Sequence, residues 1–254
     1  MSHLIAFQTI LFREIYRFLR IWPQTVLPPA ITTSLYFLIF GHLIGGRIGQ
    51  MGQVSYIDYI VPGIILMSVI TNAYGNVVAS FYSTKFQRNI EEMLIAPVPN
   101  GVILAGYVLG GVMRGLVTGS MVAAIGALFT PLHVVHPELV VTIFLLTAIL
   151  FSLAGFINAV YANSFDDISI VPNFVLNPLV YLSGVFYSID LLPEVWRNIS
   201  LVNPMFYMIN TFRYGFLGHS DVDVGLSLLV IGGTIVVLLV WAWYLLARGI
   251  GLKS

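Results

Sequence analysis

The sequence contains no cysteine and very little charge. Only 9% of its 254 residues are charged, and the formal net charge is +0. The lack of cysteine excludes disulfides, thiolate metal sites and cysteine nucleophiles. The low charge excludes an ordinary soluble domain, in which about 25% of residues are charged. Because the few basic residues are dispersed, we expect no nucleic-acid partner.

Apolar residues dominate what is present. They make up 58% of the chain, and the mean hydropathy is +0.94. A helix that crosses the hydrocarbon core of a bilayer needs about 20 mainly apolar residues. The sequence therefore predicts an all-α, polytopic membrane protein that forms one transmembrane domain over 1–254. The six predicted transmembrane helices are 24–44, 60–82, 110–131, 139–161, 168–188 and 225–247, the first five of them within 22–188.

The third span is the least regular of the six. Gly110, Gly111, Gly115 and Gly119 recur through it and predict close approach of a neighbouring helix. Arg114 interrupts the apolar run, and we expect its side chain to reach toward the inner interface.

The N-terminal segment 1–21 has an amphipathic pattern. Apolar residues recur every three or four positions, while three arginines fall on another face. This pattern is typical of a helix that lies in the membrane interface. The alternative is that the arginines anchor the inner end of the first span. The apolar residues are Leu4, Phe7, Leu11, Ile15, Phe18 and Trp22, and the arginines are Arg13, Arg17 and Arg20.

The basic residues predict the orientation. Short cytoplasmic loops are enriched in lysine and arginine. With six spans both termini lie on one side, which holds most of the basic residues, whereas the other side holds only Arg47, Arg197 and Arg213. We therefore expect both termini in the cytoplasm.

The chain has no recognisable site for ATP. A P-loop places a lysine directly after a glycine, but the two lysines follow Thr84 and Leu252. Between the second and third spans, segment 84–97 has apolar residues at helical spacing and ends in prolines. It predicts a short amphipathic helix, which either docks a partner or rests on the bilayer. The residues assigned to docking are Lys85, Phe86, Arg88, Ile90, Glu91, Glu92, Met93 and Leu94.

Segment 189–214 is too polar for a span and too apolar for a free loop. Such a segment enters a membrane only when its backbone is satisfied by helical hydrogen bonds or protein contacts. We predict two short re-entrant helices at the outer side. An aromatic belt at the interface is the alternative, and both descriptions can hold together. The residues that define the re-entrant region are Gly184, Pro193, Asn203, Pro204 and Arg213.

The order of these motifs resembles that of ABC-2 type transporter permeases. Pro62-Gly63 comes first, followed by the sequence LIAPVPN, then LSG at 182–184, Pro193, Asn203-Pro204 and Arg213. The resemblance covers nearly the whole chain.

The resemblance implies a type V exporter-like half-transporter in a bacterial inner membrane. It implies a homodimer of permeases with two copies of an ABC ATPase subunit, which bind ATP and Mg, so no cofactor, metal or catalytic residue is expected in this chain. The resemblance assigns 3–20 as the amphipathic connecting helix and 84–97 as the helix that couples the permease to the ATPase. It assigns 189–214 as the outer re-entrant helices. Substrates of the family range from lipid-linked glycans to drugs. An ATP-independent channel or secondary transporter is the alternative function.

Polar and aromatic residues inside spans one, two and five are candidates for lining the pathway. Polar groups inside a membrane are costly and are often functional, although single asparagines also bond helices together. The candidates are Tyr36, Phe37, Phe40, Asn72, Tyr74, Asn76, Asn173 and Asn177.

Two apparent motifs carry no chemistry in this interpretation. His219-Ser220-Asp221 has hydrolytic residue types in immediate succession, but a triad is assembled by geometry. His133, His136 and Glu138 are close in sequence, yet a zinc site needs three or four ligands in place.

Overall fold

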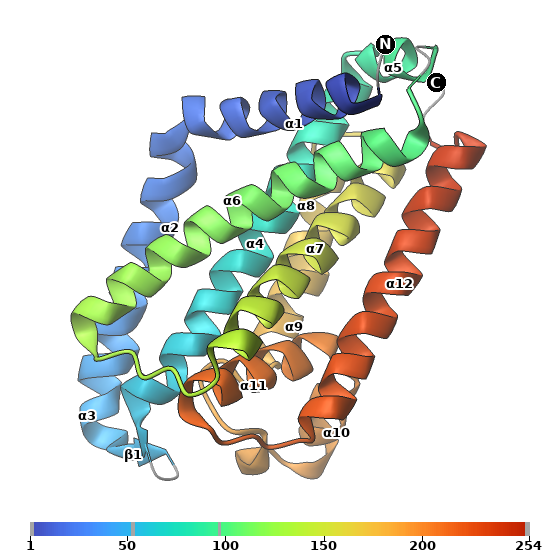
Figure 1. The fold of residues 1–254 in the computed structure, drawn as a ribbon. Helices are drawn as coiled ribbons and strands as arrows, with labels where there is room; N and C mark the ends of the chain where they lie inside the picture. The colour runs from blue at the N-terminus through green and yellow to red at the C-terminus, as the bar shows by residue number, and fades with distance from the viewer. Residues whose placement is uncertain (1–2, 52–53, 96–97, 252–254) are drawn as a thin grey trace.

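The computed structural model describes residues 3–51, 54–95 and 98–251 and is almost entirely helical (Figure 1). Among these residues, five helices are long and apolar enough to cross a membrane: Trp22–Ile48, Tyr56–Phe86, Asn100–Phe129, Pro137–Tyr161 and Val224–Arg248. These five contain or overlap the predicted spans 24–44, 60–82, 110–131, 139–161 and 225–247. The all-α, polytopic prediction is therefore confirmed.

The elements follow one another in a simple order. A hairpin of two short antiparallel strands, β1 (Gln50–Met51) and β2 (Val54–Ser55), precedes the longest helix. The main helices are α1 (His3–Arg20), α2 (Trp22–Tyr36), α3 (Gly45–Ile48), α4 (Tyr56–Phe86), α5 (Asn89–Ile95), α6 (Asn100–Phe129), α7 (Pro137–Tyr161), α8 (Asp167–Val171), α9 (Asn177–Tyr181), α10 (Glu194–Val202), α11 (Pro204–Leu217) and α12 (Val224–Arg248). A π-helical stretch, Phe37–Ile44, joins α2 to α3, and another, Pro172–Leu176, joins α8 to α9.

The core lies around α4, which α6 and α7 flank closely. A Cβ built on Gly111 of α6 would lie 2.4 Å from Val77 Cγ2, and one on Gly155 of α7 would lie 2.6 Å from the carbonyl oxygen of Tyr74. Only glycine permits these helices to lie so close, because a Cβ at either position would overlap the neighbouring helix. Small residues are typical of such close van der Waals packing inside a membrane. The predicted close approach through the third-span glycines is therefore confirmed.

The predicted fifth span, 168–188, is wrong in its length. The helical stretch from Asp167 ends at Tyr181 and contains Pro172 and Pro178. Its 15 residues extend about 22 Å, which is less than the roughly 30 Å of a hydrocarbon core. Residues 182–188 continue as turns and bends rather than helix. Apolar composition alone does not distinguish such a turn from the end of a helix.

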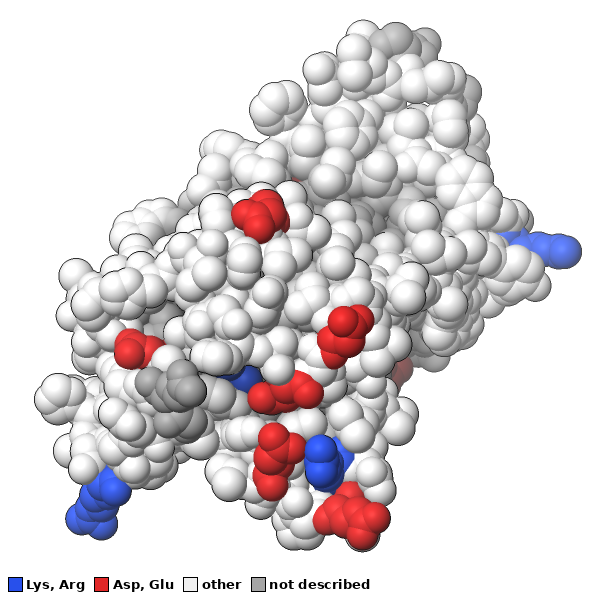
Figure 2. Space-filling model, turned by 60° about the horizontal axis from the view of Figure 1, so that its bottom comes forward, with Lys and Arg blue, Asp and Glu red and all other residues white. Residues whose placement is uncertain are grey.

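The two ends of the bundle differ in character. Figure 1 places both termini, α1 and α5 at one end, and the β hairpin, α10 and α11 at the other. The second end carries mainly acidic groups on the face that Figure 2 shows. Segment 189–224 contributes Asp190, Glu194, Asp221 and Asp223 to this part of the chain. We call the first end the terminal end and the second the hairpin end.

Candidate functional site

The segment 84–97, predicted as one amphipathic helix, is divided between two helices. Lys85 and Phe86 belong to the last turn of α4, and a break at Gln87 and Arg88 separates them from α5. Arg88 has φ +61, a left-handed conformation that ends the helix. Residues 96–97 and the side chains of Glu91 and Leu94 lie outside the described part of the structure.

Helix α5 is anchored on one side and open on the other. Ile90 is buried against the core, and Met93 packs on it partly buried. Glu92 is exposed, as are Phe86 (63%) and Ile95 (85%). An apolar surface of this kind, beside charged groups and at the tip of the bundle, is typical of an interaction site.

The ammonium group of Lys85 makes contacts within the chain and is not free for docking a partner. Its Nζ donates to the carbonyl oxygens of Val160 and Ala162, each at 2.7 Å. These carbonyls lie at the C-terminal end of α7, where cations are favoured. Lys85 therefore holds the end of α4, next to α5, to the end of α7. The neighbouring Phe86 packs against Phe165 at a ring separation of 5.0 Å.

The turn between α7 and α8 is also internally satisfied. The backbone N–H of Asn163 and that of Ser164 donate to Asp167 Oδ2 at 2.8 and 3.1 Å. The bond from Asn163 and the contact with Ser164 hold the pKa of Asp167 below its ordinary value. Asp167 thus stabilises the turn that adjoins the Lys85 contact.

A buried polar cluster at the terminal end centres on Glu14, which sequence reasoning missed. The Glu14 side chain is 1% exposed. Its Oε1 accepts from Ser80 at 2.6 Å, and its Oε2 accepts from Arg17 at 3.2 Å. Arg17 also donates to the side-chain and backbone oxygens of Asn76 at 2.9 and 3.1 Å. Helix α1 is therefore bonded to the middle of α4.

Neighbouring residues extend this cluster to α6. Arg13 donates to the hydroxyl of Tyr107 at 2.6 Å, and Tyr107 donates to Thr84 at 3.0 Å. Arg114 donates to Asn72 at 3.4 Å, so its side chain points to α4 and not to the inner interface as expected. Arg13 and Arg17 of α1 and Arg114 of α6 thus serve polar contacts inside the protein.

The pattern of α1 contained a signal for Glu14. Ile10, Glu14 and Phe18 are four residues apart and are the buried residues of α1. A single carboxylate between two apolar residues of one helical face indicates a buried partner. Leu4, on the predicted apolar face, is 63% exposed, and the interfacial position of that face stays a prediction.

At the hairpin end, Arg213 of α11 joins two motifs that are distant in sequence. It is 4% exposed, and it donates to the carbonyl and hydroxyl oxygens of Tyr59 at 3.1 and 2.8 Å. It also donates to the carbonyl oxygen of Gly184. The guanidinium lies 3.8 Å from the centroid of the Tyr59 ring. Arg213 therefore connects α4, the turn after α9, and α11.

The turn at Gly184 fits closely on α4. Gly184 has φ +76, which favours glycine, and a Cβ on Gly63 would lie 3.0 Å from the Cα of Val185. Asn203 donates to the carbonyl oxygen of Leu179 at 2.6 Å, and its side chain accepts from the N–H of Met205. Asn203 therefore caps α11, which begins at Pro204, and joins it to α9.

The hairpin end also contains a cavity. Its volume is 380 Å³, and Tyr59, Asp190, Arg213, His219 and Asp221 are among its lining residues. Burial raises the pKa of Asp221, although nearby Arg213 opposes this effect. In the described residues no group of three metal-ligand side chains occurs, and His136 instead stacks on Tyr214 at 5.0 Å.

The candidate pathway residues separate into three groups. Phe37, Tyr74 and Asn76 are buried inside the protomer and serve packing or the polar cluster. Tyr36 and Phe40 pack on Phe186 of the outer turn at ring separations of 5.8 and 4.8 Å. Of the remaining candidates, Asn72 is buried on α4, Asn173 is exposed and Asn177 is partly exposed.

A groove of 230 Å³ lies between α2 and α4. Tyr36 and Asn72 line it together with Pro28, Pro29 and Thr32, and further lining residues are Thr33, Ile64, Met67, Ser68 and Thr71. It lies between two helices that are long enough to span a membrane, and its hydroxyl and amide groups stand among apolar residues. The structure therefore brings together only these two of the eight pathway candidates in one groove.

Comparison with known proteins identifies the family of this chain. The model of the ABC-2 type transporter family matches residues 5–217, which include most of α1, the Glu14 cluster, α5 and Arg213. The chain belongs to the ABC-2 type transporter family. The ABC-2 chain is 56% identical over 256 residues to the inner membrane transport permease YadH of Escherichia coli strain K12, covering 100% of both chains.

More distant relatives of this ABC-2 chain are also known. Nodulation protein J of Rhizobium leguminosarum bv. trifolii is 26% identical over 191 residues, which are 75% of this chain and 73% of that protein. Nodulation protein J of Neorhizobium galegae is 22% identical over 228 residues, which are 89% of this chain and 87% of that protein. The similarity of this ABC-2 family member thus extends beyond one set of close relatives.

Proposed function

We propose that this chain is the permease subunit of an ABC exporter in a bacterial inner membrane. Two copies form a homodimer, and each copy engages a separate ABC ATPase subunit that binds ATP and Mg. The termini, α1 and α5 face the cytoplasm in this proposal. The ABC-2 family match and the absence of a P-loop support it.

The observation that carries the proposal is the exposed face of α5. Glu92 and Ile95 of α5 and Phe86 at the adjoining end of α4 are exposed at the terminal end, while Ile90 fixes α5 to the bundle. Closure of an ATPase shifts the permease only if the ATPase contacts its two states differently. A small helix that is anchored on one side and open on the other suits that role.

Helix α4 is suited to carry the movement across the membrane. Its end at Phe86 is joined to α5 by the turn at Gln87 and Arg88, and its opposite end holds Tyr59, which binds Arg213. In between, Ser80 and Asn76 bond to α1. In this proposal a displacement of α5 moves the end of α4, and α4 passes it on to α1 and to the outer turn.

The groove between α2 and α4 is the proposed start of the translocation path. Its hydroxyl groups and the Tyr36 ring suit an amphipathic cargo, namely a lipid-linked, glycan or hydrophobic drug-like substrate. In the homodimer, the exposed sides of these helices face each other across the path. Transport is then powered mechanically, with no chemistry in this chain.

The deciding experiment is affinity purification of the full chain from its native membrane in mild detergent, followed by mass spectrometry and an ATPase assay. We expect a nucleotide-binding subunit in an amount equal to the permease. Glu92→Arg is expected to abolish its recovery or to uncouple ATP hydrolysis from transport. Glu194→Arg, a matched change at an exposed glutamate of the hairpin end, is expected to leave both intact.

Two results would contradict the proposal. Full coupling in Glu92→Arg would remove α5 as the docking site. Recovery of an oligomer without ATPase in every detergent would favour an ATP-independent channel or secondary transporter.

A further inference from the structure

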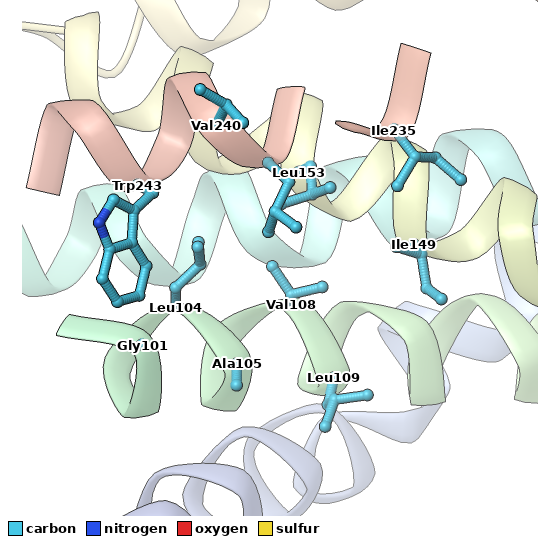
Figure 3. Close-up of a pocket in the computed structure, with 11 residues that line it drawn as sticks. Gly101, Leu104, Ala105, Val108, Leu109, Ile149, Leu153, Ile235, Val240 and Trp243 are labelled. Atoms are coloured by element: carbon cyan, nitrogen blue, oxygen red, sulfur yellow. The ribbon is translucent and has the colours of Figure 1, made fainter. Parts of the chain in front are cut away.

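An apolar groove of 600 Å³ runs between α6 and α12, over a floor that α7 helps to form (Figure 3). Leu104 and Val108 of α6 and Leu153 of α7 are buried at its base, at 3%, 8% and 1% exposure. Leu109 and Trp243 also line the groove and are 37% and 50% exposed. All of its lining residues are apolar or glycine. The groove is distinct from the α2 and α4 groove, which lies on other helices.

The length of the groove corresponds to one leaflet of a bilayer. Along α6 it extends from Gly101 to Leu109, and along α12 from Ile235 to Trp243. Each of these stretches covers about 12 Å of helix axis. Half of a hydrocarbon core is about 15 Å. Because Gly101 is in the first turn of α6 and Trp243 is near the end of α12, the groove opens at the terminal end.

We propose that this groove binds one acyl chain of a phospholipid from the cytoplasmic leaflet. The side of the membrane rests on the orientation in the proposed function. The groove lies between three helices that are long and apolar enough to span a membrane, so lipid hydrocarbon surrounds it. It holds no polar partners for water, and an empty groove would forfeit dispersion contacts along its walls. A linear, flexible chain one leaflet long fills this shape.

The terminal end of the groove suits a lipid headgroup. A Cβ on Gly101 would lie 2.8 Å from Cζ3 of Trp243, so the missing side chain lets the indole lie over the first turn of α6. Tryptophan is enriched at this depth of a membrane. Arg248 follows on the same helix, exposed and 5.7 Å from the ring of Tyr244. No ion pair of the described residues involves Arg248, so it is available to an anionic phosphate.

The first test uses a substitution that fills the groove. Ala105 lines it, whereas Ala127 is an exposed alanine of the same helix outside it. Full-length protein is reconstituted in vesicles of phosphatidylcholine and phosphatidylglycerol, purified in mild detergent and analysed for retained phospholipid by mass spectrometry. Ala105→Phe is expected to lose the tightly held phospholipid that wild type and Ala127→Phe retain. Equal retention in all three overturns the proposal.

A second test does not depend on tolerance of the larger side chain. Because the sequence has no cysteine, Ala105→Cys and Ala127→Cys each carry a single thiol. A lipid-soluble maleimide is expected to modify residue 105 several-fold more slowly in vesicles, and delipidation should remove most of the difference. A difference that survives delipidation, or a disulfide-linked dimer through residue 105, shows protein in place of lipid and overturns the proposal.

The headgroup contact is tested separately. Arg248→Gln is expected to reduce retention of phosphatidylglycerol relative to phosphatidylcholine, while an unchanged ratio removes Arg248 from the site. None of these measurements involves ATP hydrolysis or transport. Failure of the lipid site and failure of the exporter proposal are therefore distinguishable.

Discussion

Glu14 and Gly110 contact each other at the crossing of α1 and α6, where a Cβ on residue 110 would lie 2.5 Å from the Cβ of Glu14. This close approach carries the carboxylate inward to Ser80. Three elements therefore meet at one buried charge, and α1 is fixed relative to the helix that leads into α5. The exporter mechanism proposed above depends on this connection.

Gly110→Ala is expected to destabilise the protein by about 1–3 kcal/mol, because the added methyl group meets a backbone-proximal atom of Glu14 that has little freedom to move. Thermal unfolding of the purified protein in detergent measures the effect. Gly75→Ala in α4 is the matched control, since a Cβ at residue 75 has no atom within 4 Å. A change in the control as large as that in Gly110→Ala would show that helix packing at Glu14 is not close.

Glu14→Ala is expected to cost about 2 kcal/mol, because it leaves Arg17 and Ser80 without their shared acceptor. The cost stays below that of a fully buried pair, since the Arg17 side chain is 33% exposed. Unfolding in detergent again measures it, and Glu14→Gln should cost less because an amide oxygen still accepts from Ser80. Glu138→Ala, at a carboxylate that is 69% exposed, is expected to change stability little. Loss of stability in Glu138→Ala alone would contradict this assignment.

Arg213→Lys is expected to destabilise the hairpin end by about 2–3 kcal/mol, because an ammonium group cannot reach Tyr59 and Gly184 with the planar fork of a guanidinium. Limited proteolysis of the segment 182–203 reports the loosened turn, and thermal unfolding reports the free energy. Arg197→Lys serves as the control, since Arg197 forms only an exposed ion pair with Asp190 at 3.2 Å. Equal protease resistance in both variants would rule out the bridging role of Arg213.

Asp221→Asn is expected to stabilise the protein at neutral pH and to have no such effect in acid. Burial raises the pKa of Asp221 above 3.8, so the folded state binds a proton more tightly than the unfolded state. The carboxylate therefore lowers stability progressively as pH rises from about 4 through the raised pKa. The midpoint temperature of thermal unfolding is measured from pH 4 to 8. It should be higher for the variant than for wild type only at the upper end of this pH range. A constant difference across this range would contradict the burial effect.

Particular residues show how far sequence reasoning extends. The spacing of apolar residues predicted the spans near 60–82 and 139–161, because hydrophobic length alone decides which segments cross a membrane. The same criterion was wrong for 168–188, where Pro172, Pro178 and the turn at Gly184 shorten the helix while the composition stays apolar. Likewise, helical periodicity placed α5 but extended it over Lys85, whose contacts with the end of α7 depend on distant chain segments.

The sequence by itself determined that this protein lies in a membrane, that it is helical, that it carries the family motifs and that it has no P-loop. Those properties follow from composition and local spacing, which every segment carries alone. The tertiary structure decided that Glu14 is buried against Gly110, that Arg213 joins Tyr59 to Gly184, and that an apolar groove remains between α6 and α12. Each of these depends on how separate helices cross, and the crossing is set by close packing of many side chains at once.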